Sequence, residues 1–389
     1  PFRSTASGNT GGAAILQGSD SVAAAIRSNG GTIAIGTSGT AATGFGADIS
    51  GIKDGIYLDN AVLDSRIAGD ADQTGANITL NGRAPTTTVA GAGVRIKGAL
   101  ANVRSGTGNL SISGTVPGGS SSGQKDGVVI GEDGSSRVTL ATTSGAIAIT
   151  GDATGVGTSP SVTGASRYDG VVISSAALVQ TDSGNITIVG KGSGGDQSYL
   201  VENHGIKLEN AKTSIVSTSG NISLYGSSGG KTSDSGGANS FGIYSAGDSM
   251  YIGSAPSTAV SGGVTAGGIV TLAADSMQFI NASNLHLNVA SGGELRVHTE
   301  TAGRNITFGT PGGVDKLYLG SNWFNGASTS VFQPGFTDIV FGHAASAASA
   351  TSTPVLSAST GTLTVAAATT LRDHAILEMD GTGGNVKIN

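Results

Sequence analysis

Short runs of alternating apolar and polar residues recur up to about residue 276 in two forms. The first form is a Gly followed by an apolar–variable–apolar triplet, and it occurs at Gly55–Leu58, Gly93–Ile96, Gly127–Ile130, Gly170–Ile173, Gly205–Leu208 and, more weakly, Gly242–Ser245. The second form usually has Asn or Ala before the alternation, and it occurs at Gly31–Ile35, Gly75–Leu80, Gly108–Ile112, Gly145–Ile149, Gly184–Ile188, Gly220–Leu224 and Gly268–Leu272. Copies of the first form start between 34 residues (Gly93 to Gly127) and 43 residues (Gly127 to Gly170) apart. The chain is therefore built from repeats.

The alternation has the period of a half-buried β-strand, and no block is long enough for a helix. A shorter apolar segment lies between the two forms, as at Ala61–Leu63 and Thr213–Val216. Asp-Gly pairs at Asp54-Gly55, Asp126-Gly127 and Asp169-Gly170 predict turns directly before the first strand of a repeat. We therefore expect three strands in each repeat and almost no helix.

One such repeat cannot bury its apolar face alone, but stacked repeats bury a continuous core. The predicted fold is all-β, a right-handed parallel β-helix (β-solenoid). One inward column of this stack is predicted to contain Ile78, Leu110, Ile147, Ile186 and Ile222. Only 4% of the residues are aromatic, which is expected for a narrow core filled with small aliphatic side chains.

Gly- and Ser-rich segments separate the repeats at residues 114–126, 151–169, 190–204 and 226–241. All of them follow the second form of strand, so the loops should lie along one side of the solenoid. Without them each coil has about 22–26 residues, which is normal for a solenoid. Within these loops we expect the sequence to be most variable, and deletions to be tolerated best, at residues 118–122, 192–195 and 227–235.

Two regions are distinguished by repeat length. Residues 1–276 are predicted to form a β-solenoid with repeats of about 37 residues, and 277–389 to continue it with shorter coils. The strands predicted after residue 276 include Met277–Ile280, Leu285–Val289, Glu294–His298 and Ile376–Met379, whereas residues 344–361 are predicted to be a loop. Eleven or twelve coils are expected in total.

Composition narrows the possible roles. The 389 residues contain no Cys, so neither a disulfide framework nor a thiol nucleophile is possible. A net charge of −6 offers nothing to a nucleic-acid backbone, and no apolar run is long enough for a membrane-spanning helix. A weakly charged, Cys-free chain is typical of extracellular proteins and the bacterial cell surface. The start, Pro1-Phe2-Arg3-Ser4, has no signal peptide, so we expect either a processed protein or a piece of a longer one.

The order of motifs resembles a known family. Gly205–Ala211 followed by Ser219–Gly226 is similar to the repeats of filamentous haemagglutinin-like proteins and other giant bacterial surface adhesins. Gly303–Gly309 with Asp338–Gly342 resembles a second module of the same proteins. The resemblance implies a secreted β-solenoid that acts as an adhesin, a filament or a toxin stalk. The amino-terminal secretion domain and carboxy-terminal β-barrel found among such proteins are not recognisable, which suggests an internal fragment or an unusual member.

An enzyme on the same scaffold is the alternative, because polysaccharide lyases and hydrolases also use parallel β-helices. Such an enzyme needs two or three clustered carboxylates, or a carboxylate with Arg or Lys. The strongest acidic concentration is formed by Asp48, Asp54, Asp59, Asp64, Asp70 and Asp72. At the phases of Asp54 and Asp59 the next coil has Ala92 and Lys97 instead. We interpret this patch as a solvated strand face, with a calcium site as a second possibility.

Metal and phosphate motifs are weak. The nonapeptide of calcium-binding β-rolls is missing, and Gly194–Asp196 and Gly131–Gly134 are isolated fragments. The five histidines, His204, His286, His298, His343 and His374, are predicted to lie at surfaces or turns. His286 and His298 could be neighbours across coils, but two histidines without a third ligand make a poor metal site. No catalytic, cofactor-binding or metal-binding residue is predicted, and no cofactor.

Asn-x-Ser/Thr occurs at Asn77, Asn109, Asn185, Asn221, Asn281 and Asn305. The repeat itself generates these sites, because an outward Asn precedes an inward aliphatic residue and an outward Ser or Thr. We therefore interpret them as ladders of stacked amides along the solenoid rather than as glycosylation sites.

The sequence thus predicts a non-enzymatic extracellular structural or adhesive β-solenoid, a segment of a large surface protein or filament. Its expected partners are a glycan or surface ligand and further coils at its ends. Gly11–Gln17 already has the strand pattern, and Asn385–Asn389 ends in an alternating strand without a cap. We therefore expect end-to-end self-association or continuation in a longer chain.

Overall fold

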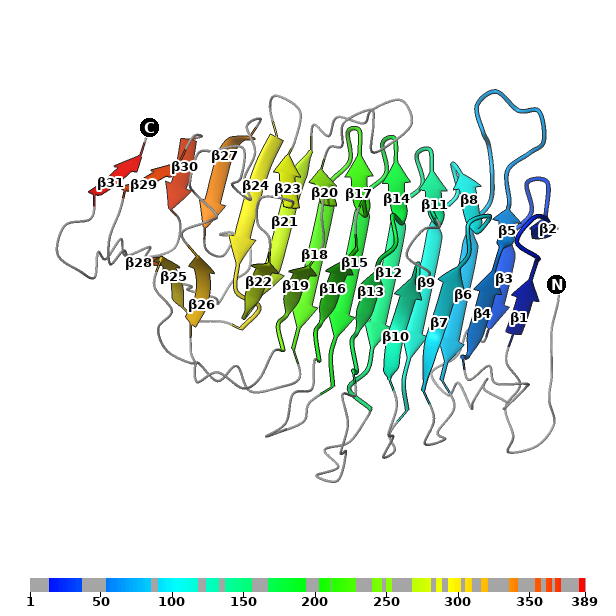
Figure 1. Ribbon diagram of the computed structural model, residues 1–389. Coiled ribbons are helices and arrows are strands. Elements are labelled where there is room, and N and C mark those ends of the chain that lie inside the picture. The colour runs from blue at the N-terminus through cyan, green and yellow to red at the C-terminus, as the bar shows by residue number, and fades with distance from the viewer. Residues whose placement is uncertain are drawn as a thin grey trace.

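A computed structural model of the chain shows strands, turns and loops, with no helix among the residues that it describes. These residues are 14–36, 54–84, 90–117, 124–132, 137–155, 167–193, 203–210, 212–228, 240–246, 250–253, 268–280, 285–288, 293–301, 305–309, 316–320, 336–341, 354–357, 362–365, 368–371 and 385–388. The strands lie side by side in one elongated stack (Figure 1), which confirms the predicted parallel β-solenoid.

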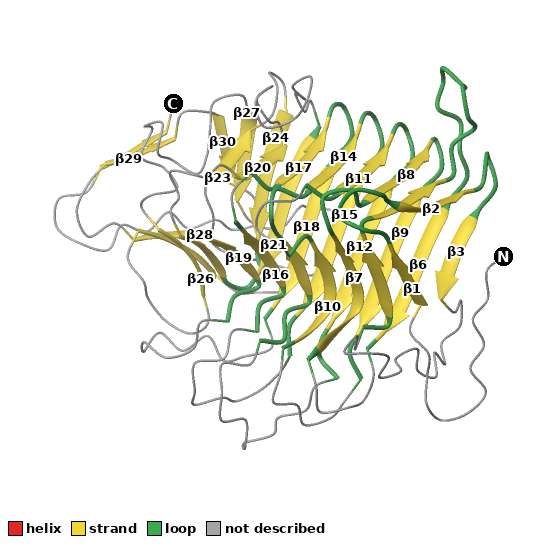
Figure 2. Cartoon of the chain, turned by 45° about the vertical axis from the view of Figure 1, so that its right-hand side comes forward, coloured by secondary structure: helices red, strands yellow, loops and turns green. Residues whose placement is uncertain are grey.

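Each of the first eight coils gives one strand to each of three parallel sheets (Figures 1 and 2). The first sheet consists of β1 (Ala14–Gln17), β4 (Ile56–Asp59), β7 (Gly91–Lys97), β10 (Lys125–Ile130), β13 (Val171–Ile173), β16 (Ile206–Glu209), β19 (Ile243–Ala246) and β22 (Met277–Ile280). The second consists of β2 (Ala24–Arg27), β5 (Ala61–Asp64), β8 (Asn102–Gly106), β11 (Thr139–Thr142), β14 (Leu178–Thr181), β17 (Ser214–Ser217), β20 (Met250–Gly253) and β23 (Leu285–Asn288). The third consists of β3 (Ile33–Gly36), β6 (Ile78–Arg83), β9 (Leu110–Thr115), β12 (Ile147–Asp152), β15 (Ile186–Lys191), β18 (Ile222–Ser227), β21 (Ile269–Ala274), β24 (Gly293–His298), β27 (Phe336–Phe341) and β30 (Ala368–Leu371).

The core is the column of aliphatic side chains that the repeat pattern predicts. Ile78 pairs with Leu110, Leu110 with Ile147, Ile147 with Ile186, and Ile186 with Ile222. All five are buried, because alternate residues of these strands point into the narrow space between the three sheets. The inward column is therefore confirmed, and each coil is held mainly by its two neighbours.

The third sheet continues past residue 276, since β21 pairs with β24, β24 with β27 and β27 with β30. The sequence predicts eleven or twelve coils, and the described strands of this sheet number ten. Two small parallel sheets accompany them: β25 (Asn305–Gly309) with β26 (Lys316–Gly320) and β28 (Pro354–Ser357), and β29 (Thr362–Val365) with β31 (Asn385–Ile388). The loop predicted at 344–361 is wrong where β28 lies. A strand of four residues is too short for its alternation to be recognised in the sequence. The predicted strand Ile376–Met379 lies outside the described residues.

The residues at the start of the third-sheet strands or directly before them form what we call the third-sheet column: Asn77, Asn109, Ala146, Asn185, Asn221 and Ile269. The Oδ1 atom of each of the four asparagines accepts a hydrogen bond of 2.9 Å. The donor is the backbone N–H at the same position of the next coil. These asparagines are exposed. The predicted ladder is thus present, but it joins side chains to backbone rather than amide to amide. Asn281 and the side chain of Asn305 lie outside the described residues.

A second column of side chains lies at the start of the first-sheet strands or just before them. This first-sheet column consists of Asp54, Ala92, Asp126, Asp169, His204 and Phe241, as the strand registers require. Its side chains accept the backbone N–H groups of Ala92, Asp169, His204 and Phe241 at 2.5, 3.0, 2.7 and 3.0 Å. The Asp residues of the Asp-Gly pairs therefore join consecutive coils. The turn predicted at Asp126-Gly127 is wrong, because both residues lie within β10.

Most of the long connections run from the third sheet to the first and leave at the same edge of the stack. The β21–β22 connection is an exception because it contains only residues 275 and 276, and the β5–β6 and β20–β21 connections, from the second sheet to the third, are also long. This arrangement agrees with the prediction that the Gly- and Ser-rich loops occupy one side. Most of 118–122, 192–195 and 227–235 lies outside the described residues. The division into 1–276 and 277–389 stays a prediction.

Candidate ligand-binding groove on the second sheet

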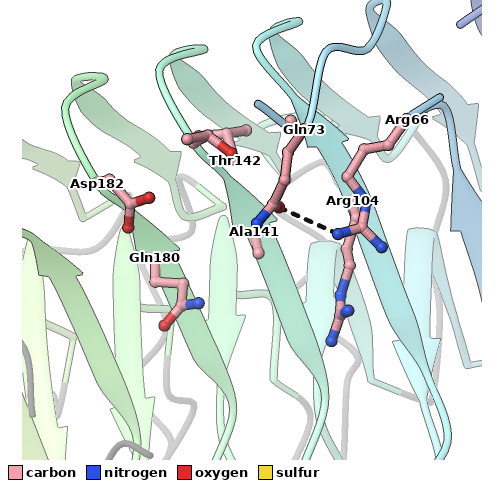
Figure 3. Close-up of a pocket in the computed structure, with 9 residues that line it drawn as sticks. Arg66, Gln73, Arg104, Ala141, Thr142, Gln180 and Asp182 are labelled. Atoms are coloured by element: carbon pink, nitrogen blue, oxygen red, sulfur yellow. Dashed lines mark hydrogen bonds between the residues drawn. The ribbon is translucent and has the colours of Figure 1, made fainter. Parts of the chain in front are cut away.

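The outer face of the second sheet has a groove with a volume of about 260 Å³. One outward row of side chains runs across it, in which Arg104 of β8 pairs with Ala141 of β11, and Ala141 with Gln180 of β14. Ala141 has only a methyl group, whereas its two neighbours in the row have long polar side chains. The row therefore dips at Ala141, with Arg66 and Arg104 on one side of the dip and Gln180 and Asp182 on the other (Figure 3).

One long turn forms a wall of the groove. The connection from β5 to β6 runs through residues 65–77, whereas the equivalent connections in the next two coils are only 107–109 and 143–146. The longer turn folds back on itself, because Arg66 bridges Gly75 in antiparallel fashion and the N–H of Ile67 donates to the carbonyl of Thr74 at 2.8 Å. At its tip Asp70 accepts the N–H groups of Asp72 and Thr74, each at 3.0 Å.

This turn also packs against the next coil along the chain, which contains β8. The carbonyl oxygen of Gln73 lies so close to Gly106 that any side chain at position 106 would overlap it. Gly106 has a φ of 60°, a left-handed conformation that favours glycine. Gly106 is therefore required both by its conformation and by the space that the turn needs.

Arg66 is held in place by hydrogen bonds within the wall. Its Nε and Nη2 atoms donate to the two carboxylate oxygens of Asp64 at 2.9 and 2.7 Å, and its Nη1 atom donates to Gln73 Oε1 at 3.1 Å. The hydrogen bonds from Arg66 outweigh burial and lower the pKa of Asp64, and the bond to Asp64 raises the pKa of Arg66. The charge of Arg66 is thus largely balanced by its partner.

Arg104 has no such carboxylate. Its Nε atom donates to the neutral amide oxygen of Asn102 at 2.8 Å, and among the described residues no ion pair involves its guanidinium. Partial burial and the nearby charge of Arg66 lower the pKa of Arg104 and the charge of Asp64 opposes them, but Arg104 stays charged at every physiological pH. Because Asp64 is hydrogen-bonded to Arg66, Arg104 is the less compensated positive charge of the groove.

The far wall supplies uncharged and acidic hydrogen-bonding groups. Gln180 of β14 is half-buried, and Asp182 follows that strand and is exposed. Between the walls the Thr142 hydroxyl donates to the carbonyl of Gly145 at 2.5 Å, so its proton is already used within the turn. The groove thus has a cation at one end and hydrogen-bond acceptors at the other, two rungs or about 10 Å away.

A second hollow of about 320 Å³ lies on the other side of the same turn and is lined by Asp64 and Asp70. Both carboxylates are occupied, Asp64 by Arg66 and Asp70 by the backbone of its own turn. Hydrogen bonds lower the pKa of each, whereas the general acid of a glycosidase needs a raised pKa. These two groups therefore lack the protonation state that acid catalysis requires near neutral pH.

The predicted acidic patch is spread over two sheets. Asp59 pairs with Lys97 in the register and lies in the first sheet with Asp54, whereas Asp64, Asp70 and Asp72 belong to the second sheet and its turn. The interpretation as a solvated face is wrong for Asp54, which is buried against Arg95, with Nε 3.0 Å from Oδ2. Asp48 lies outside the described residues.

The histidines also differ from prediction. His204 precedes β16 and is buried rather than at the surface, and it packs against Phe241 and Tyr244, whose ring centroids lie 5.9 and 4.2 Å from its own. Burial, with the charges of Lys207 and Arg167, lowers the pKa of His204 to about 3. His286 and His298 are not neighbours across coils, because β23 belongs to the second sheet and β24 to the third. His343 and His374 lie outside the described residues.

Within the described part of the chain, no three His, Cys, Asp or Glu side chains come together as metal ligands would, and no helix could cross a membrane. Comparisons of the chain with protein-family models, curated proteins and solved structures gave no match. The fold and the groove therefore define this protein only as a parallel β-solenoid with a polar groove on its second sheet. The resemblance to filamentous haemagglutinin-like proteins stays a prediction.

Proposed function

We propose that this chain is an extracellular structural and adhesive β-solenoid that contacts a surface ligand through the groove of its second sheet. The observation that supports this is the position of an open polar groove on an unbroken stack of parallel strands. Neighbouring coils share a backbone ladder, with one register shift between Ala141 and Thr142, so the row Arg104, Ala141 and Gln180 is held at the spacing of the strands. A stiff support of this kind presents a binding surface without closing around its ligand.

The first described coil supports end-to-end association as the second part of the proposal. Its inward residues Ala14, Leu16, Ile26 and Ile35 are only partly buried, whereas Leu58 and Leu63 of the next coil are buried. An apolar layer of this shape is suited to pack against another coil of the same polypeptide or of another copy. Contacts of that kind that do not close into a ring produce filaments.

The test is retention of the chain on surfaces coated with different glycans, together with sedimentation at increasing protein concentration. We expect retention on some of these surfaces and a sedimentation coefficient that rises with concentration. Ile186→Asp is the unfolded control, because it places an unpaired carboxylate in the core column. A monomer at all concentrations that no glycan surface retains would contradict the proposal, as would release of sugar products from a polysaccharide.

A further inference from the structure

We infer that the groove of the second sheet binds a carboxylate-bearing saccharide, with its carboxylate on Arg104 and its hydroxyl groups on Gln180 and Asp182. This inference rests on the proposed adhesive function and adds the chemical class of the ligand. It also assigns different roles to the two arginines, Arg104 as the residue that binds the ligand and Arg66 as part of the wall.

The charges of the groove select an anion at the end of Arg104. Asp64 occupies two nitrogens of Arg66 and Gln73 the third, so Arg66 has little left to donate. Arg104 gives only its Nε to Asn102. Its remaining donors form one edge of a planar fork, which matches the two oxygens of a carboxylate. An anion there would also relieve the repulsion between the two guanidinium groups.

The other end of the groove selects hydroxyl groups. The Asp182 carboxylate and the Gln180 amide oxygen accept hydrogen bonds, and a second carboxylate of the ligand beside Asp182 would be repelled. A sugar hydroxyl can donate to either acceptor, and it can accept from the Gln180 amide N–H. The ligand that fits both ends therefore has an acidic group and, about two rungs away, hydroxyl groups.

The size and lining of the groove agree with a short saccharide. Its volume of about 260 Å³ lies just below the range of roughly 300–1,000 Å³ that is common for small-molecule sites. No aromatic side chain lines it, so binding has to come from charge and hydrogen bonds rather than ring stacking. Its long direction crosses the rungs from Arg104 to Gln180, which suits an extended chain more than a compact molecule.

The experiment is calorimetric titration of the full chain with a uronic acid trisaccharide and with the same trisaccharide whose carboxyl groups are reduced to alcohols. We expect the acidic form to bind at least ten-fold more tightly, and the difference to shrink in high salt. Arg104→Ala should remove this difference, and Arg104→Lys should restore only part of it because a lysine lacks the fork. Ala141→Leu, which fills the dip, should weaken both forms.

Arg27→Ala is the matched control, since Arg27 stands in the same outward row two coils away and does not line the groove. It should leave both affinities unchanged, and circular dichroism should show the same β signal for all variants. Equal affinity for the acidic and reduced forms would overturn the inference and leave the adhesive function standing. No binding of either form, with retention on another glycan surface, would also overturn it, as would a sulfate ester that binds as tightly as the uronate.

Discussion

The first-sheet and third-sheet columns perform the same task with different chemistry. In both, a side chain at the start of a strand or just before it accepts the backbone N–H group at the same position of the next coil. The third-sheet column uses asparagines that are exposed to solvent, whereas the first-sheet column uses Asp126, Asp169 and His204, all of them fully buried. The geometry of the repeat thus fixes the hydrogen bond, whereas burial of the acceptor determines how its protonation affects stability.

Burial changes the pKa of the acids in the first-sheet column. Burial raises the pKa of Asp126 to about 6, and burial together with the charge of Asp126 raises the pKa of Asp169 well above its usual range. A neutral amide in the third-sheet column has no such dependence on pH. Two columns with one geometry should therefore respond differently to acid, to truncation and to exchange of Asp for Asn.

The largest difference is expected on truncation at pH 5, where Asp126 is protonated. Asp126→Ala leaves the buried N–H of Asp169 and the partly buried amide of Gln124 without their acceptor. We expect a loss of roughly 2–4 kcal/mol in the free energy of unfolding, from the unsatisfied groups and the small cavity. Urea denaturation measures it, and a loss below that of Asn109→Ala would contradict the comparison.

The pH dependence should come second. Between about pH 4 and 6 the folded protein keeps the proton of Asp126 and the unfolded chain releases it, so this group's contribution to stability is lost as pH rises through that window. Asp126→Asn cannot ionise, and it should gain roughly 1–3 kcal/mol relative to the parent between pH 4 and 7. The measurement is urea denaturation of both proteins at each pH.

His204 makes this difference measurement necessary. Its pKa of about 3 means that the folded protein keeps His204 neutral while the unfolded chain becomes protonated below about pH 6.5. His204 therefore adds stability as pH rises, which opposes the effect of Asp126. Both proteins contain His204, so its effect cancels in the difference. A difference that stays constant from pH 4 to 7 would show that Asp126 has an ordinary pKa.

Truncation in the third-sheet column should cost less. Asn109→Ala removes the acceptor of the Ala146 N–H, but water can replace it because the site is exposed. We expect a loss of about 0.5–1 kcal/mol, with little change between pH 4 and 7. Asn109→Asp is the informative partner, since an exposed carboxylate keeps the acceptor and should nearly retain the stability of the parent at pH 7.

The sequence predicts one of these columns better than the other. Asn77, Asn109, Asn185 and Asn221 precede an apolar alternation at a constant phase, and this pattern by itself indicates a ladder. Asp126 and Asp169 precede Gly, and the turn propensity of Asp-Gly conceals their equivalent role. Their common phase is the signal that could reveal it. Their burial depends on what covers the outer side of the first sheet, which no local pattern contains.

The groove is harder to predict than the fold. The long connection 65–77 can be recognised in the sequence as an interruption of the repeat, and Ala141 as a small residue in an outward row. Whether Arg66 or Arg104 is compensated depends on which arginine reaches Asp64, and this is a matter of side-chain geometry. Fold class follows from periodicity, whereas a binding site on a repeat protein depends on its departures from the period.

The smallest effect is expected at the alanine of the third-sheet column. Ala146 interrupts the third-sheet column, and the register places Asn185 at the same position of the next coil. Ala146→Asn would offer an Oδ1 acceptor to the Asn185 N–H at a half-exposed site, and should raise the free energy of unfolding by up to about 0.5 kcal/mol.

Ala92 interrupts the first-sheet column, but it is fully buried against Val129. Ala92→Asn would therefore overpack this site and lower stability by about 1–3 kcal/mol. Thermal unfolding of both variants measures these changes. A gain in stability for both substitutions, or for neither, would mean that exposure does not distinguish the two columns.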